Sequence, residues 1–176
     1  TLKKYILAFQ KTRKMKLLIV AATYTEIESS ISMIRQKQID YLITGVGMTA
    51  TAFALGKRLQ QKPYDLILNV GIAGALDYII PIGSTVQITT DIISELGAQD
   101  PQGFIPIDKL GFGLSTFTPR QPEDIVLELP KYTGITVNTV HGIASSIHAI
   151  RTMFPTAAIE SMEGAAVFYA ALQDNV

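Results

Sequence analysis

Short apolar runs of strand length alternate with amphipathic stretches of helical spacing, and this alternation constrains the fold more than any other feature. KLLIVAA at 16–22 predicts a buried strand, and TEIESSISMIRQ at 25–36 predicts a helix with isoleucines on one face. We expect further strands at 41–47, 65–74, 84–93, 135–145 and 157–161, and helices at 49–61, at 146–154 and from 164 onward. Continuous apolar strands that alternate with helices indicate an α/β fold whose sheet is covered on both faces.

The composition is that of one globular domain. The chain has 176 residues, of which 48% are hydrophobic and 17% charged, enough for a sizeable core. It has no cysteine, which excludes disulfides and thiolate metal sites, and its two histidines are too few for a histidine-rich metal centre. No apolar run reaches the ~18 residues that span a bilayer.

The charge is distributed unevenly. The first fourteen residues carry five Lys/Arg and no acid, so 15–176 holds 15 − 5 = 10 basic and 15 acidic residues, a net charge of −5. A body of that sign is a poor candidate for nucleic-acid binding. We expect 1–14 to be a basic extension upstream of a natural start at Met15; a short targeting or membrane-surface segment is the alternative.

Glycine-rich turns and acids follow the predicted strands as GVG, NVGIAG, VHG and ESMEG. Ligands of such folds bind beyond the carboxyl ends of the strands. GVGMTA at 45–50 has the G-x-G-x-x-A form of a dinucleotide fingerprint, but it follows the second strand, and the third strand ends without the acid that would hold a ribose. A tight turn or a glycine loop against a sugar or phosphate are the competing interpretations.

Two acids stand near these turns. Glu163 precedes AAVFYAAL, which is apolar all round and therefore buried, so its carboxylate needs a partner or a ligand. The simpler interpretation is that Ser161 caps the helix and Glu163 interacts with its positive end. In the first helix Glu26 and Glu28 have equal local claims. His141 stands near the end of a predicted strand. A structural role is the simpler interpretation for it, and a place in the same ligand site as Glu163 is the alternative.

Four stretches of the sequence carry a family resemblance: MKLLIVAATYTEIE, GVGMTATA, NVGIAGAL followed by PIGSTVQITTD, and above all ESMEGAAV. Over nearly all of 15–176 the chain resembles the nucleoside phosphorylase/hydrolase superfamily. Within it the chain resembles the methylthioadenosine/S-adenosylhomocysteine nucleosidases and the futalosine hydrolases, with ESMEGAA and GIAG favouring the latter. The resemblance implies a three-layer α/β/α sandwich around a central mixed, largely parallel sheet.

The resemblance also implies roles for individual residues. Glu26 would activate the attacking water, and Glu163 would bind the ribose hydroxyls with Met162 against the sugar. The remaining substrate-binding positions that it implies are Gly47, Gly71, Ile72, Ala73, Gly74, His141, Gly142, Ile143 and Ser161. Ile72 stands where the family offers a serine.

The implied reaction is hydrolysis of a purine riboside through an oxocarbenium-like sugar. The substrate would be futalosine, a hypoxanthine riboside with a carboxyphenyl tail, in menaquinone biosynthesis; Lys109 and Arg120 could meet that tail, although surface solvation is their simpler role. No metal or other cofactor is required, and the expected protein is a cytoplasmic homodimer or higher homo-oligomer that binds neither nucleic acid nor membrane.

The family continues beyond the ESMEGAA helix into another core strand, whose end supplies the residue facing N7 of the purine, and then into a last helix. We therefore expect 15–176 to be a single nucleosidase-like domain that lacks this final strand and helix and is a poor enzyme as it stands. Three alternatives remain open: a methylthioadenosine/S-adenosylhomocysteine nucleosidase, a dinucleotide-binding enzyme, and a non-catalytic nucleoside-binding remnant.

Overall fold

A computed structural model describes residues 15–120 and 127–176; the predicted extension 1–14 lies outside the described residues. The helices are α2 (Tyr24–Ile27), a 3₁₀ turn (Glu28–Ser30), α3 (Ile31–Gln36), α4 (Met48–Leu59), α5 (Ala144–Met153) and α6 (Gly164–Asp174). The strands are β1 (Leu17–Ala21), β2 (Asp40–Ile43), β3 (Leu66–Asn69), β4 (Gly74–Ala75), β5 (Gln87–Ile93), β6 (Gly97–Asp100), β7 (Gly103–Pro106), β8 (Thr116–Phe117), β9 (Lys131–Thr136) and β10 (Ala157–Ser161).

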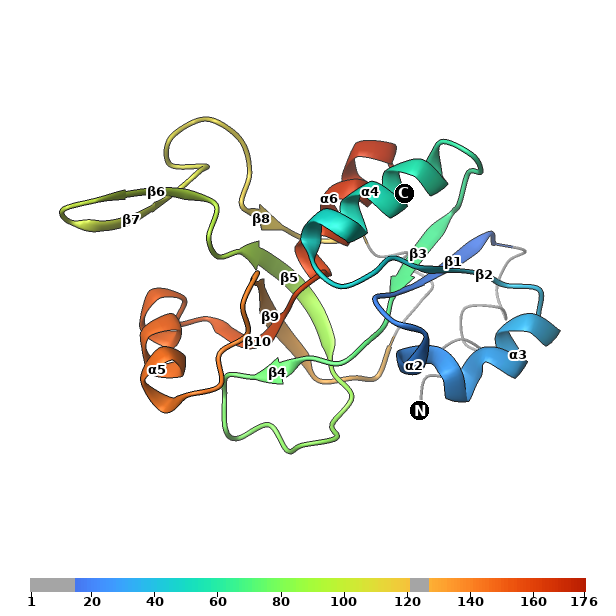
Figure 1. The fold of residues 1–176 in the computed structure, drawn as a ribbon, viewed down its shortest axis with the longest axis horizontal. Helices are drawn as coiled ribbons and strands as arrows, with labels where there is room; N and C mark the ends of the chain where they lie inside the picture. The colour runs from blue at the N-terminus through green and yellow to red at the C-terminus, as the bar shows by residue number, and fades with distance from the viewer. Residues whose placement is uncertain (1–14, 121–126) are drawn as a thin grey trace.

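The strands pair mostly in parallel (Figure 1). β2, β1 and β3 form an all-parallel sheet in that order. A second sheet has the order β4-β10-β9-β5-β8, in which the three inner strands are parallel and the two edge strands antiparallel. The chain passes from the first sheet to the second between β3 and β4. β6 and β7 form a separate antiparallel pair. The predicted mixed, largely parallel arrangement is therefore confirmed, with its hydrogen-bonded ladders divided between two larger sheets and this hairpin.

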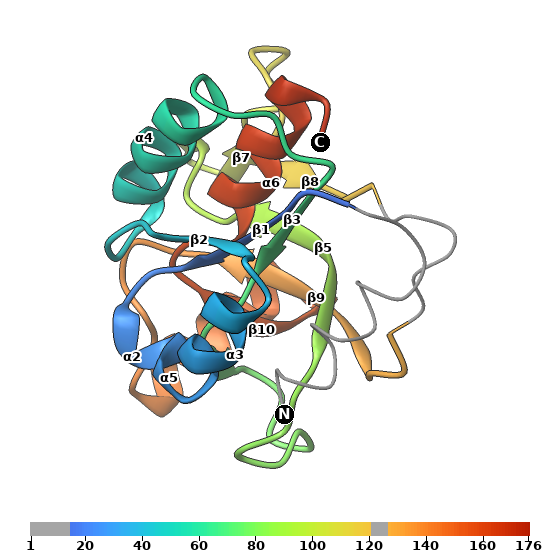
Figure 2. The ribbon, with the colours of Figure 1, turned by 90° about the vertical axis from the view of Figure 1, so that its right-hand side faces the viewer.

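Alternate side chains of β1 enter two different cores. Leu17 and Ile19 pack with Ile27 and Ile34 of the α2–α3 region. On the opposite face, Leu18 and Val20 pack with residues of α4 and α6, which are Leu55, Leu59, Val167 and Ala170. Figure 2 shows α4 and α6 on one side of this sheet and α2 and α3 on the other. Helices therefore cover both faces of this sheet, as a parallel sheet requires. The predicted α/β/α layering is confirmed.

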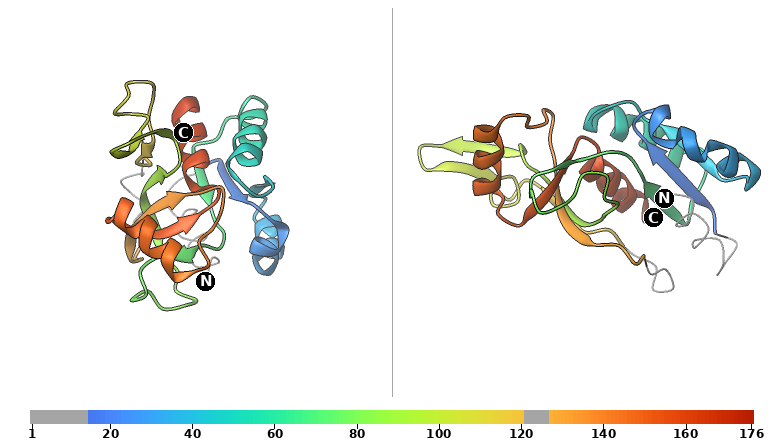
Figure 3. Two further views of the ribbon diagram at one scale, coloured as in Figure 1. Left: turned by 60° about the vertical axis from the view of Figure 1, so that its left-hand side comes forward. Right: turned by 90° about the horizontal axis from the view of Figure 1, so that it is seen from below.

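A third core lies beside the second sheet. Ile135 and Val137 pack there against Ile150 and Phe154 of the α5 region, together with Leu76. Figure 3 shows α5 and the β6–β7 hairpin at one end of the molecule, with α2, α3 and α4 at the other. None of the helices in the part of the chain that is described is both long and apolar enough to cross a membrane.

The structure corrects three predicted elements. The span 95–134 is rich in glycine and proline, which predicts a long functional loop or an insertion without regular elements, but it contains β6, β7 and β8 and the first part of β9. The strand predicted at 135–145 is wrong, because β9 covers Lys131–Thr136 and α5 already begins at Ala144. These strands are short or contain polar residues and glycine, so no apolar periodicity marks them. The helix at 25–36 is interrupted by the 3₁₀ turn at Glu28–Ser30.

Candidate active site

The carboxyl ends of β1, β2 and β3 lie along one edge, because the three strands are parallel. Each end leads into a segment that carries a predicted site residue. Glu26 follows β1, Gly47 follows β2, and Gly71 follows β3. Neighbouring strand ends therefore bring together residues that the sequence separates widely.

Glu26 makes contacts on both sides of its carboxylate. Its Oε2 accepts hydrogen bonds from the Thr23 backbone N–H at 2.7 Å and from the Thr23 hydroxyl at 3.1 Å. Its Oε1 accepts a hydrogen bond from the Ile72 backbone N–H at 3.2 Å. The first pair of bonds belongs to the capping box between Thr23 at the N-cap and Glu26 at the third helical position, a contact that needs no function to explain it. The Ile72 contact, in contrast, directs the same carboxylate to the loop after β3.

Gly71 is needed at this point because of the space that it leaves. A Cβ built on Gly71 would stand 2.7 Å from Oε1 of Glu26, closer than real Cβ contacts come. Glu28, the competing acid, is exposed in the 3₁₀ turn. Of the two acids, Glu26 is the one that contacts this loop at the strand ends.

Glu163 is held by the turn after β2. Its Oε1 accepts a hydrogen bond from the Gly47 backbone N–H at 2.8 Å, and its Oε2 has no hydrogen-bond partner among the described residues. Gly47 has φ +95° and stands at the start of α4, a conformation that favours glycine. Ser161 accepts the Gly164 N–H at 3.2 Å, as its predicted capping role requires, and Met162 is half-buried.

Glu160 and His141 form a second pair. The buried Glu160 accepts the His141 backbone N–H at 2.9 Å on Oε1 and lies 2.7 Å from His141 Nδ1 on Oε2. A Cβ added to Gly74 would stand 3.0 Å from Cγ of Glu160. The loop from Gly71 to Gly74 therefore contacts the Glu26 carboxylate at one end and the Glu160 side chain at the other.

The other predicted residues lie on exposed segments. Ile72 is 84% exposed, and Ala73, Gly142 and Ile143 are exposed as well. Lys109 and Arg120 are also exposed, as expected of solvated side chains. No group of three or more His, Cys, Asp or Glu with metal-binding geometry occurs within 15–120 and 127–176.

Asp91 is a buried acid that no motif in the sequence singles out. It lies in β5, is 2% exposed, and accepts a hydrogen bond from the Thr136 hydroxyl at 2.8 Å. Burial raises the pKa of Asp91 to about 7, and the bond from Thr136 offsets only part of that rise. The one signal in the sequence was an acid in the middle of the strand pattern TVQITTDII.

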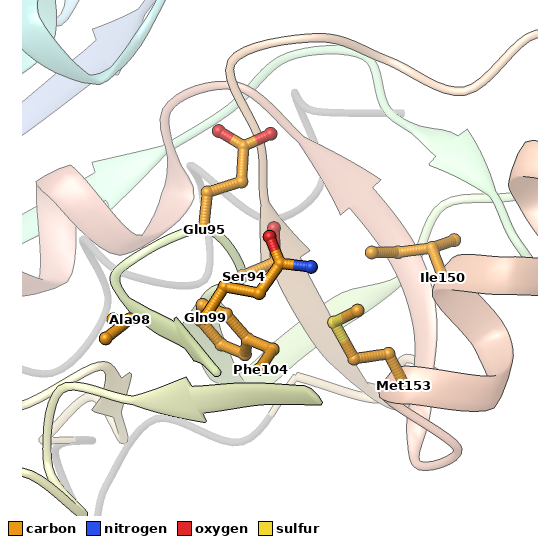
Figure 4. Close-up of a pocket in the computed structure, with 8 residues that line it drawn as sticks. Ser94, Glu95, Ala98, Gln99, Phe104, Ile150 and Met153 are labelled. Atoms are coloured by element: carbon orange, nitrogen blue, oxygen red, sulfur yellow. The ribbon is translucent and has the colours of Figure 1, made fainter. Parts of the chain in front are cut away.

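A pocket of about 360 Å³ lies between the β6–β7 hairpin and α5 (Figure 4). Ile150 and Met153 extend from α5 toward Phe104 and Gln99, and Ser94 lies at the end of β5. Glu95, also in the lining, bonds to Asn138 at 2.8 Å. None of the predicted site residues lines this pocket, so it is separate from the edge that carries Glu26 and Glu163.

Comparison of the sequence with known proteins finds relatives over most of the chain. The futalosine hydrolase of Streptomyces coelicolor is 36% identical over 148 residues, which are 78% of this chain and 62% of the relative. The futalosine hydrolase of Acidothermus cellulolyticus is 35% identical over 147 residues, 78% of this chain and 59% of the relative. The chain thus spans about three fifths of these relatives. No protein-family model matches it.

Solved structures share the fold. The methylthioadenosine/S-adenosylhomocysteine nucleosidase of Neisseria meningitidis, in complex with methylthio-immucillin-A, superposes with a TM-score of 0.73 at 16% identity, over 91% of this chain and 80% of that one. A mutant of the Helicobacter pylori nucleosidase with 5′-methylthioadenosine in its active site gives a TM-score of 0.74 at 14% identity, over 93% and 82%. The similarity to futalosine hydrolases and the fold shared with the nucleosidases together support a member of the nucleoside phosphorylase/hydrolase superfamily close to the futalosine hydrolases.

Proposed function

We propose that the protein hydrolyses the N-glycosidic bond of a purine riboside, with futalosine as the substrate. The observation that carries the proposal is that Glu26 and Glu163 both contact loops at one edge of the β2-β1-β3 sheet. The identity of 35–36% to futalosine hydrolases supports the choice of substrate. The shared nucleosidase fold favours a methylthioadenosine/S-adenosylhomocysteine nucleosidase as the second candidate.

The proposed chemistry divides between the two acids. Glu26 accepts a proton from water as the water oxygen bonds to C1′ of the ribose. The C1′–N9 bond breaks, and its electron pair leaves with the purine, which takes up a proton. Positive charge develops on the sugar in this step, and a carboxylate at the ribose hydroxyls stabilises it more than it stabilises the ground state. The Oε2 of Glu163, which accepts no hydrogen bond from residues 15–120 or 127–176, supports that role.

The glycine loop after β3 is suited to bind the sugar and the water. Gly71 and Gly74 expose their backbone where side chains would collide with Glu26 and Glu160. We propose that substrate binds over Gly71–Gly74, beside Met162, with His141, Gly142 and Ile143 on the side of the purine. The 2.7 Å contact between His141 Nδ1 and Oε2 of Glu160 supports this arrangement, because it fixes the orientation of the imidazole ring.

Glu26→Ala is the decisive variant, and Glu28→Ala, on an exposed neighbour, is its matched control. Hypoxanthine release from futalosine and adenine release from methylthioadenosine are measured side by side by chromatography. We expect Glu26→Ala to abolish release while calorimetry still detects nucleoside binding, and Glu28→Ala to retain the wild-type rate. An active Glu26→Ala protein would refute the role of Glu26, and faster release of adenine would favour the second candidate.

The proposed assembly is a homodimer or a higher homo-oligomer, and the proposed location is the cytoplasm. Large apolar side chains after β3 support self-association, since Ile72 is 84% and Ile79 is 85% exposed, with Tyr78 and Ile82 nearby. Light scattering at several concentrations, with Ile79→Lys as the perturbed variant, measures the mass. A wild-type protein that is monomeric at micromolar concentration would contradict this assembly.

A further inference from the structure

Three buried polar groups form a chain behind the first turn of α6. The Ala165 backbone N–H donates to the Thr136 hydroxyl oxygen at 2.8 Å. The Thr136 hydroxyl in turn donates to Oδ1 of Asp91, also at 2.8 Å. Thr136 is 0% and Asp91 2% exposed, so water does not substitute for these bonds. The chain links β5, β9 and the start of α6, all three of which come from distant parts of the sequence.

Two glycines make room for the Asp91 carboxylate. A Cβ on Gly164 would stand 2.1 Å from Oδ2, and one on Gly134 would stand 3.3 Å from the same atom. A buried carboxylate is costly, and an apolar residue of similar volume is often as stable or more so in such a position. Packing alone therefore gives no reason for an acid here.

The buried series of hydrogen bonds ends at residues next to Glu163. Gly164 and Ala165, which contact Asp91 and Thr136, directly follow Glu163 in the sequence. The Glu163 side chain is held from the other side by the Gly47 N–H at 2.8 Å. Its orientation therefore depends on two anchors, the Gly47 turn at the carboxylate and the first turn of α6 at the backbone.

We propose that Thr136, oriented by Asp91, is a positioning residue for Glu163, an inference that rests on the proposed function. Because the Thr136 proton points to Asp91, a lone pair of the same oxygen faces the Ala165 N–H and holds the first turn of α6 in place. A small displacement of a group that acts on the reacting atoms reduces turnover more than it reduces binding. Neither Thr136 nor Asp91 needs to touch the substrate for this effect.

The test measures kcat and KM for hypoxanthine release in single variants and in a double-mutant cycle. Thr136→Val keeps the branched shape and removes the hydroxyl, so we expect kcat to fall roughly tenfold or more with little change in KM. In a Glu163→Gln background the same change is expected to have an effect below about twofold, because interacting residues are non-additive. Thr136→Ser restores the hydroxyl and is expected to restore most of kcat.

Ser94→Ala is the matched control. Ser94 is also buried, and its hydroxyl donates to the backbone carbonyl of Thr136 at 3.3 Å, outside the path to α6. We expect this variant to lower the thermal midpoint while kcat stays within about twofold of wild type. The same fold-loss of kcat from Thr136→Val in the wild-type and the Glu163→Gln backgrounds would overturn the proposal. A kcat loss in Ser94→Ala as large as that in Thr136→Val would overturn it too. If Thr136→Val does not fold, a kcat loss of tenfold in folded Thr136→Ser overturns it as well, since that variant keeps the hydroxyl.

A calorimetric measurement separates this inference from the proposed function. A wild-type protein that releases no purine from any riboside contradicts the proposed function. The ratio of the affinities for inosine and hypoxanthine still reports the ribose contact in that case. We expect Thr136→Val to lower this ratio and Ser94→Ala to leave it unchanged; the same ratio in all three proteins would refute the positioning role.

Discussion

Replacement of Asp91 by asparagine is predicted to remove a pH dependence from the stability of the fold. The pKa of Asp91 is about 7 in the folded protein, against an ordinary value of 3.8. Between those values the folded state binds a proton that the unfolded state has already released. The free energy of unfolding therefore falls as the pH rises through this range. The difference of about 3 pKa units, at 1.36 kcal/mol per unit, gives a destabilisation on the order of 4 kcal/mol above pH 7.

The assay is urea denaturation of wild type and Asp91→Asn at several pH values between about 4.5 and 7.5. Asparagine is neutral throughout, and its side-chain oxygen still accepts the Thr136 hydroxyl. The free energy of unfolding of wild type minus that of the variant is expected to fall by about 3 kcal/mol across this range. This subtraction cancels the histidines and other groups that titrate in both proteins. A difference that stays constant within about 0.5 kcal/mol would show that Asp91 does not hold a proton in the folded state.

Three glycine substitutions test the close approaches at the site. Gly71→Ala directs a Cβ at Oε1 of Glu26, at 2.7 Å, and is expected to lower kcat by roughly 10²-fold with little loss of stability, because Gly71 is exposed. Gly164→Ala, whose Cβ would stand 2.1 Å from Oδ2 of Asp91, is expected to cost about 1–3 kcal/mol or more in urea denaturation. Gly56→Ala, exposed in α4 with nothing within 4 Å of its Cβ, is expected to stabilise by about 0.5–1 kcal/mol and leave kcat unchanged. Similar losses of kcat in all three variants, or similar losses of stability in all three, would contradict the assigned contacts.

The sequence by itself determined the layers of the fold and the positions of its main turns. Apolar runs of strand length, as in LLIVA, and helical spacing in MTATAFALGKRL are local patterns, and the structure confirms β1 and α4 within one or two residues. Glu163 could also be singled out locally, since it precedes a helix that is apolar all round, whereas Glu26 and Glu28 had equal local claims and only the resemblance to the nucleosidases favoured Glu26. Periodicity failed for β6 to β9, where short strands with glycine and polar residues carry no apolar signal.

Only the tertiary structure decided which side chains meet. Three contacts depend on the order of the strands in the sheets. They are those of Glu26 with the Ile72 N–H, of Glu163 with the Gly47 N–H, and of Glu160 with His141. The high pKa of Asp91 likewise depends on burial by elements far away in the chain. Strand order and burial are sums over many long-range contacts, whereas periodicity reports only on near neighbours. A single acid in a strand pattern therefore cannot reveal its partner until the fold brings the two together.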